Sequence, residues 1–182
     1  MSSQMHSSAR VRATRALASA GVALYAVAGV ATAKTPGTIY CINDVCHRVQ
    51  TLAETSAMIG HEETVRASFY DDCKVDTGNP CTQLSSGEEL RADLADNAAS
   101  PVYPDGTVLV LSNPKNDAQA RVRINNSGPY VKGRLLDVSR ATARQLGFID
   151  AGVTELQIKV VAAPPMGDDR DRGLQRVSAG PN

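Results

Sequence analysis

The chain has 182 residues, and its 19 lysines and arginines balance its 19 aspartates and glutamates. A balanced charge excludes the dense basic surface that nucleic-acid binding uses, so we expect no nucleic-acid partner. The length fits one domain, which we expect to be a monomer, and no motif indicates a cofactor.

The first 33 residues have the three parts of a secretory signal peptide in order. Arg10, Arg12 and Arg15 supply a positive start, an apolar stretch covers residues 16–30, and small residues lead to a cleavage site after Ala33. The stretch is shorter than the ~20 residues of a spanning helix, so a retained membrane anchor is the less favoured alternative. No cysteine lies near the cleavage site, which argues against a lipoprotein. We expect a periplasmic or secreted protein, soluble after cleavage and without stable membrane insertion.

Four cysteines lie in the exported part of the chain, Cys41, Cys46, Cys73 and Cys81. An even number in an oxidising compartment predicts two disulfides. Asn43 and Asp44 suit a two-residue hairpin turn, which would place Cys41 opposite Cys46; Cys73 and Cys81 would then close a second loop. The alternative is a metal site made by the first pair and His47, but its spacing matches no zinc pattern, so we expect no metal.

Four segments have the apolar patterns of strands, residues 65–69, 107–111, 120–124 and 156–160. Ser139 can cap a short helix over residues 140–146, and Gly147 suits the left-handed position that ends it. The long polar stretch of residues 71–104 is predicted to be a loop, with at most a short strand or turn inside it. Short strands, one short helix and long loops together predict a small all-β barrel.

The stretch from Arg123 to Ser139 reads R-I-N-N-S-G-P-Y-V-K-G-R-L-L-D-V-S. It resembles a signature of the rare lipoprotein A (RlpA-like) family, which reads approximately R-I-N-D-R-G-P-F-V-K-G-R-I-I-D-L-S and precedes a short helix. Upstream, residues 86–88 are similar to the family's S-G-E, and residues 104–107 to its P-L-G-T. The resemblance covers about residues 66–161, most of the exported chain.

The resemblance implies a six-stranded double-psi β-barrel with a short helix, preceded by a β-hairpin extension. The expected divisions are a signal peptide at 1–33, the hairpin extension at 34–64, the barrel at 65–162 and a disordered tail at 163–182. The best-known family members are endolytic lytic transglycosylases, which cleave the glycan strands of peptidoglycan to anhydro-ended products. The alternative is a non-catalytic peptidoglycan-binding or envelope-structural barrel.

Lytic transglycosylation needs a group that protonates the glycosidic oxygen and then accepts the proton of the sugar's 6-hydroxyl, which a carboxyl group with a raised pKa can do. The S-G-E match makes Glu88 the expected acid and base, with Asp93 and Asp96 as helpers. The chain departs from the family signature where Asn126 replaces an aspartate, where Ser127 replaces the following arginine, and where Ser100 lies in place of a histidine. Glu88 therefore favours the enzyme, and Asn126 with Ser100 favours the binder.

The expected substrate-binding residues are Arg121, Arg123, Asn126, Ser127, Tyr103, Tyr130 and Ser100. The arginines could instead form an outward polar strand face, Tyr130 could belong to the core, and the carboxylates could be solvated loop residues. Asp137 is expected to brace the adjoining loop or helix rather than to react. His47 is expected to be an ordinary hairpin residue.

Overall fold

The computed structural model describes residues 34–72, 74–76 and 84–166. The expected signal peptide, the pair Cys73 and Cys81, and the tail beyond residue 166 lie outside the described residues. Two strands first form a hairpin, β1 (Ile39–Ile42) with β2 (Val45–Arg48). Six further strands form a closed barrel: β3 (Glu62–Tyr70), β4 (Asn97–Ala99), β5 (Val108–Ser112), β6 (Gln119–Asn126), β7 (Leu136–Ser139) and β8 (Val153–Ala162).

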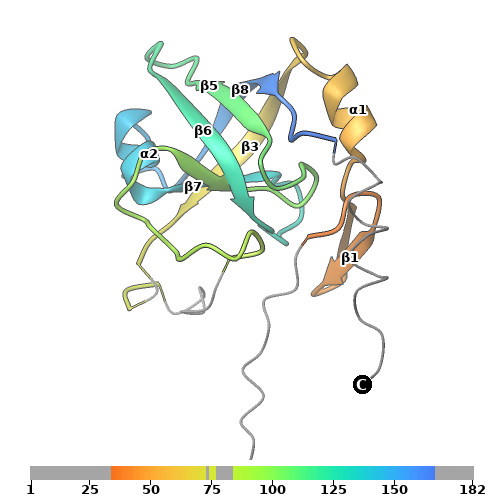
Figure 1. The fold of residues 1–182 in the computed structure, drawn as a ribbon. Coiled ribbons are helices and arrows are strands. Elements are labelled where there is room, and N and C mark those ends of the chain that lie inside the picture. Colours follow the sequence, from red (N-terminus) through yellow and green to blue (C-terminus); the bar gives the residue numbers. More distant parts are fainter. Residues whose placement is uncertain (1–33, 73, 77–83, 167–182) are drawn as a thin grey trace, which may run out of the picture.

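The barrel has the strand order β3-β7-β4-β6-β5-β8 and is of mixed orientation (Figure 1). β3 lies parallel to β7 and β4 parallel to β6, whereas the other four neighbouring pairs are antiparallel. Parallel pairing brings together segments that are distant along the chain, and closure leaves no unpaired barrel edge. The expected all-β fold, a six-stranded double-psi β-barrel with a short helix and a preceding hairpin, is confirmed.

The core consists of the inward-facing residues of the strands. On β8, for example, Leu156, Ile158 and Val160 are buried, while the residues between them face outward. Burying one such side chain contributes about 1.5–3 kcal/mol, so the barrel itself supplies most of the hydrophobic stabilisation. This core also receives Leu146 and Phe148, which follow helix α2 (Arg140–Gln145) and cover one side of the barrel.

Helix α2 and the hairpin form where the sequence predicts them. The Ser139 hydroxyl accepts a hydrogen bond from the Thr142 backbone N–H at 3.1 Å, and Gly147 has the left-handed φ of +72°. In the hairpin, Asn43 and Asp44 have φ values of 50° and 61°, as the turn requires. The predicted register, Cys41 opposite Cys46, is confirmed, and these two residues form a disulfide.

A second helix, α1 (Leu52–Ala57), was not expected, although the sequence contains the residues that cap its N-terminus. Thr51 and Glu54 form a capping box, in which each side chain accepts a hydrogen bond from the other residue's backbone N–H. Figure 1 shows α1 and the hairpin on the side of the barrel opposite α2. Of the helices in the described part of the chain, none is long and apolar enough to span a membrane.

Candidate active site

Four adjacent strands, β3, β7, β4 and β6, present polar residues on the outside of the barrel. In register, Ser68 lies beside Asp137, and Asp137 beside Ala99. At Ala99 the β4–β6 pairing contains an irregularity, so that Asn125 and Asn126 together oppose this one residue. Such bulges re-aim side chains and are frequent next to active sites. We call this outer surface of the four strands the polar face.

Asp137 is the carboxylate of this face with the most unusual environment. It lies on β7 between the fully buried Leu136 and Val138 and is itself largely covered. The Ser68 hydroxyl donates a hydrogen bond to its Oδ1 at 2.7 Å. Burial nevertheless raises the pKa of Asp137 to about 6, because the hydrogen bond from Ser68 and the charge of Arg134 offset it only in part.

The expectation that Asp137 braces the adjoining loop or helix rather than reacting does not account for this raised pKa. At a pKa of about 6, both the acid and the carboxylate are populated near neutral pH. One signal in the sequence could have pointed to it, since Asp137 is a carboxylate inside the apolar run L-L-D-V. Such a residue on a strand is exposed to much less water than an aspartate in a polar loop.

Glu88 and Arg123, both expected site residues, come together at the β6 side of the polar face. The Glu88 Oε2 accepts hydrogen bonds from the Arg123 guanidinium at 2.8 Å and from the Asn125 amide at 3.1 Å. The Glu88 side chain is 43% exposed. Arg123 lowers the pKa of Glu88, so this carboxylate is held ionised, unlike Asp137.

A tight turn positions Glu88. The Gly87 backbone N–H donates to the Leu84 carbonyl at 2.8 Å, and the Leu84 N–H donates to the Glu88 carbonyl at 2.9 Å. Gly87 has a φ of +84°, which side chains disfavour. The Ser86 N–H donates to the Asn125 carbonyl at 3.2 Å and thereby ties the turn to the end of β6.

The two expected helper carboxylates lie in the loop that precedes β4. Asp93 is exposed and forms an ion pair with Arg91 at 3.0 Å, which lowers its pKa. Asp96 accepts a hydrogen bond from the Asn97 amide at 3.1 Å, and its carbonyl accepts one from the Arg123 backbone at 2.8 Å. Within the described residues, no hydrogen bond joins either carboxylate to Glu88.

The remaining expected residues on β6 and beyond it have varied surroundings. The Asn126 amide oxygen accepts a hydrogen bond from the Ser85 N–H at 3.1 Å. Ser127 hydrogen-bonds the half-buried Tyr130, which faces the N-terminal hairpin. Arg121 is exposed on β6 two residues before Arg123, opposite Val110 of β5.

Two expected substrate-binding residues are enclosed by the protein. Tyr103 is only 2% exposed, packs in the core and donates a hydrogen bond to Glu63 at 2.6 Å. Its proposed stacking on a sugar is therefore wrong, because neither ring face is accessible. Ser100 is fully buried, and its hydroxyl donates to the Leu135 carbonyl at 3.0 Å. It serves the fold and does not reach a substrate.

Lys34 was not expected to take part in this region. Its side chain is 1% exposed, and its ammonium lies 3.2 Å from the Asp105 carboxylate. It also donates to the carbonyls of Ser100 at 2.8 Å and Asn126 at 3.0 Å. Burial lowers the pKa of Lys34 to about 8, although Asp105 opposes this. The segment before the hairpin is thus fastened to the strands of the polar face.

No three or more histidine, cysteine, aspartate or glutamate side chains are grouped to hold a metal ion in the part of the chain that the structure describes. The chemistry available at the polar face is that of two unlike carboxylates. Asp137 can exchange a proton near neutral pH, and Glu88 carries a fixed negative charge with an arginine and an amide beside it.

Two solved structures are similar to this chain at low sequence identity. A Streptomyces papain inhibitor is 22% identical, with a TM-score of 0.45 over 57% of this chain and 97% of its own. An expansin from Clavibacter michiganensis is also 22% identical, with a TM-score of 0.41 over 58% of this chain and 52% of its own.

Curated relatives are named endolytic peptidoglycan transglycosylase RlpA. The one from Pasteurella multocida is 34% identical over 122 residues, which are 67% of this chain and 38% of that protein. The one from Campylobacter jejuni is 30% identical over 129 residues, 70% of this chain and 43% of that protein. The chain thus spans less than half the length of these relatives. A family model described as lytic transglycolase matches residues 62–158, from the start of β3 into β8. Since this match covers more than half of the sequence, the chain belongs to the lytic transglycolase family.

Proposed function

We propose that this protein is an endolytic lytic transglycosylase that cleaves peptidoglycan glycan strands in the periplasm or outside the cell. Its family and the names of its relatives support this activity. The observation that carries the proposal is the environment of Asp137, a largely covered carboxyl group whose pKa is raised to about 6 on a polar outer face. The expected signal peptide, residues 1–33, supports the location.

In the proposed reaction, Asp137 serves first as an acid and then as a base. Its protonated form donates the proton to the glycosidic oxygen, and the bond from that oxygen to the anomeric carbon breaks. The carboxylate then accepts the proton of the same sugar's 6-hydroxyl while the hydroxyl oxygen bonds to the anomeric carbon. One carboxyl group therefore completes the cycle, no water is consumed, and the product carries a 1,6-anhydro end.

Glu88 takes a different part in this proposal from the one its sequence motif suggests. A group held ionised by Arg123 is a poor proton donor at neutral pH. With Arg123 and Asn125 it offers both acceptors and donors, which suit the hydroxyl and acetamido groups of a glycan. We assign this cluster, together with Asn126 and Ser127, to substrate binding. Asp93 and Asp96 remain proposed helpers, as negative charges in the loop before β4.

The alternative is a barrel that binds peptidoglycan without cleaving it. It is favoured by Asn126, which stands where the family signature has an aspartate and cannot transfer a proton at neutral pH. It is favoured also by Ser100, whose hydroxyl is fully buried where the family signature has a histidine.

The decisive experiment compares four proteins on peptide-free glycan strands, with mass spectrometry of anhydro-sugar ends. The wild type should form these ends, Asp137→Asn should form none, and Glu88→Gln should form fewer through weaker binding. The control is Asp117→Asn, an exposed position in the turn before β6 with a φ of 57°, which asparagine tolerates. It should match the wild type. If the wild type releases nothing but co-sediments with sacculi, the binding alternative holds; if it does neither, both proposals fail.

A further inference from the structure

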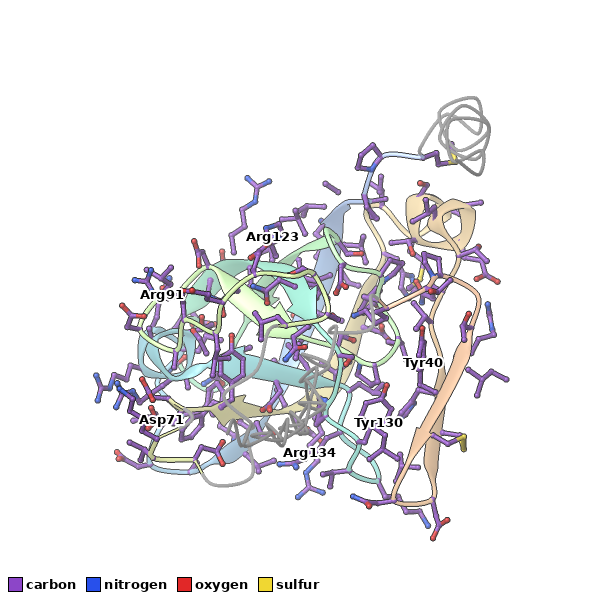
Figure 2. All side chains as sticks on the ribbon, turned by 60° about the horizontal axis from the view of Figure 1, so that its bottom comes forward. Tyr40, Asp71, Arg91, Arg123, Tyr130 and Arg134 are labelled. Atoms are coloured by element: carbon purple, nitrogen blue, oxygen red, sulfur yellow. A yellow bond between two sulfur atoms is a disulfide. The ribbon has the colours of Figure 1, made fainter. Side chains whose placement is uncertain are left out.

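The N-terminal hairpin presents two rings toward the barrel. Tyr40 of β1 lies opposite His47 of β2, so the two side chains share one face of the hairpin. The His47 ring lies 6.2 Å from that of Tyr130, tilted by 52°. Tyr40 is also near, since, after burial, its electrostatic interaction with Tyr130 further raises the pKa of Tyr130. Figure 2 shows Tyr40 and Tyr130 near each other, between the hairpin and the barrel. We call these three residues the aromatic shelf.

The shelf is held firmly in place. The Cys41–Cys46 disulfide closes the hairpin on the face opposite the shelf. At its base, Val49 is fully buried, and the Gln50 N–H donates to the Val102 carbonyl of the barrel at 2.8 Å. The Tyr40 hydroxyl accepts a hydrogen bond from the Thr35 N–H at 2.9 Å, in the segment that Lys34 fastens to the barrel. A site built this way needs little ordering when a ligand binds.

The shelf is continuous with the proposed catalytic face. Tyr130 follows Asn126, the last residue of β6, by four positions, so the two are at most ~14 Å apart along the chain. Ser127, between them, hydrogen-bonds Tyr130. A glycan strand bound across Asp137 and the end of β6 would reach the shelf where it leaves the polar face.

The chemistry of the shelf suits a sugar ring. All three side chains are half-buried, so they combine apolar ring surface with polar atoms at the edge. The His47 Nε2 is buried and has no hydrogen-bond partner in the described structure. Buried polar atoms normally have a partner, and a sugar hydroxyl could supply one if the half-buried His47 ring turns toward the bound sugar.

We propose that the aromatic shelf is a subsite for one pyranose ring of the glycan strand, beside the site of cleavage. This inference rests on the proposed function and extends it to two residues outside the family match, since Tyr40 and His47 precede residue 62. The hairpin would thus lengthen the binding surface of the barrel by one sugar, with its ring stacked on the tyrosines and a hydroxyl bonded to His47.

The test measures binding of a peptide-free glycan oligomer by calorimetry, in the Asp137→Asn background so that the strand stays uncut. Tyr40→Ala and His47→Ala should each weaken binding about 3- to 10-fold, the effect of one aromatic contact. Tyr40→Phe keeps the ring but loses the hydrogen bond from the Thr35 N–H, so it should retain more of the affinity than Tyr40→Ala. The matched control is Ile39→Ala, which is 62% exposed and lies on the other face of the hairpin.

A second measurement does not depend on how the variants fold. The ring C–H resonances of His47 in the parent protein should shift on titration with the oligomer. The dissociation constant fitted to these shifts should equal the one measured by calorimetry. Unchanged affinity in Tyr40→Ala and His47→Ala, or no shift at His47, would overturn the shelf while the parent still binds and the wild type still cleaves. Failure of the proposed function looks different, because then the wild type forms no anhydro ends, whether or not the oligomer binds.

Discussion

Replacing Asp137 with asparagine should stabilise the protein at neutral pH. Burial raises the pKa of this carboxyl from 3.8 to about 6, so ionising it costs more in the folded than in the unfolded chain. A shift of about 2 pKa units corresponds to about 3 kcal/mol at 1.36 kcal/mol per unit. Asparagine never ionises, and its amide oxygen can still accept the hydrogen bond from Ser68.

The pH dependence of this stabilisation follows from the direction of the shift. Below pH 3.8 the carboxyl is protonated in both states, so the two proteins differ little through ionisation. As the pH rises toward 6, the unfolded wild type loses the proton and the folded one keeps it, which lowers the free energy of unfolding of the wild type. Above pH 6 the penalty is constant. Asp137→Asn should therefore gain stability between about pH 4 and pH 6 and hold the gain at higher pH.

Urea unfolding of both proteins at pH 4, 5, 6, 7 and 8 measures this difference, with Asp117→Asn as the control for removing an exposed carboxylate. The variant should be more stable than the wild type by up to about 3 kcal/mol at pH 7, while lacking activity, as is common for groups strained for function. A difference that does not change with pH, or a less stable variant at pH 7, would refute the account of Asp137 as a penalised carboxyl group.

Three other changes have defined outcomes. Lys34→Ala removes the cation from two backbone carbonyls and from Asp105, and should lower the free energy of unfolding in urea by about 3 kcal/mol. The rate of anhydro-end formation should fall about tenfold per unit of pH well above pH 6, as protonated Asp137 is depleted; a flat profile up to pH 8 would contradict its role as the acid. Arg123→Ala should raise the pKa of Glu88, measured by NMR titration, and an unchanged pKa would show that their ion pair is not formed in solution.

The parts of the fold that local sequence determines were predictable. The hairpin follows from Asn43-Asp44, which accept positive φ, and helix α2 from its Ser139 cap and Gly147 end. The longer strands alternate clearly because one of their sides faces the core. The short strands were not predictable from periodicity: β4 has three residues and β7 four, and both are defined by pairing with distant segments.

Part of the candidate site could likewise be predicted from the sequence, and part could not. Glu88 and Arg123 could be named from motif and pattern, and the structure joins them. The apolar run around Asp137 hints at its burial, but the extent of its pKa shift was not predictable, because it depends on the folded barrel, and Ser68 is 69 residues away along the chain. Tyr103 was misassigned for the related reason that a tyrosine in a polar loop sequence can still be folded into the core, where its hydroxyl bonds Glu63.

A single substitution, Asn126→Asp, which restores the aspartate of the family signature, can distinguish the proposed enzyme with Asp137 as its acid from a binder that lost its acid at position 126. If the chain lost its acid there, Asn126→Asp should give an inactive protein measurable activity. If Asp137 is the acid, the same change should not raise anhydro-end formation above the wild type, and the activity should still require Asp137, because the new carboxylate can accept the hydrogen bond from the Ser85 N–H without taking part in proton transfer. The Asn126 carbonyl, which holds Lys34, is unaffected by the substitution. Activity that appears only in Asn126→Asp, and persists when Asp137→Asn is added to it, would show that the catalytic proton never belonged to Asp137.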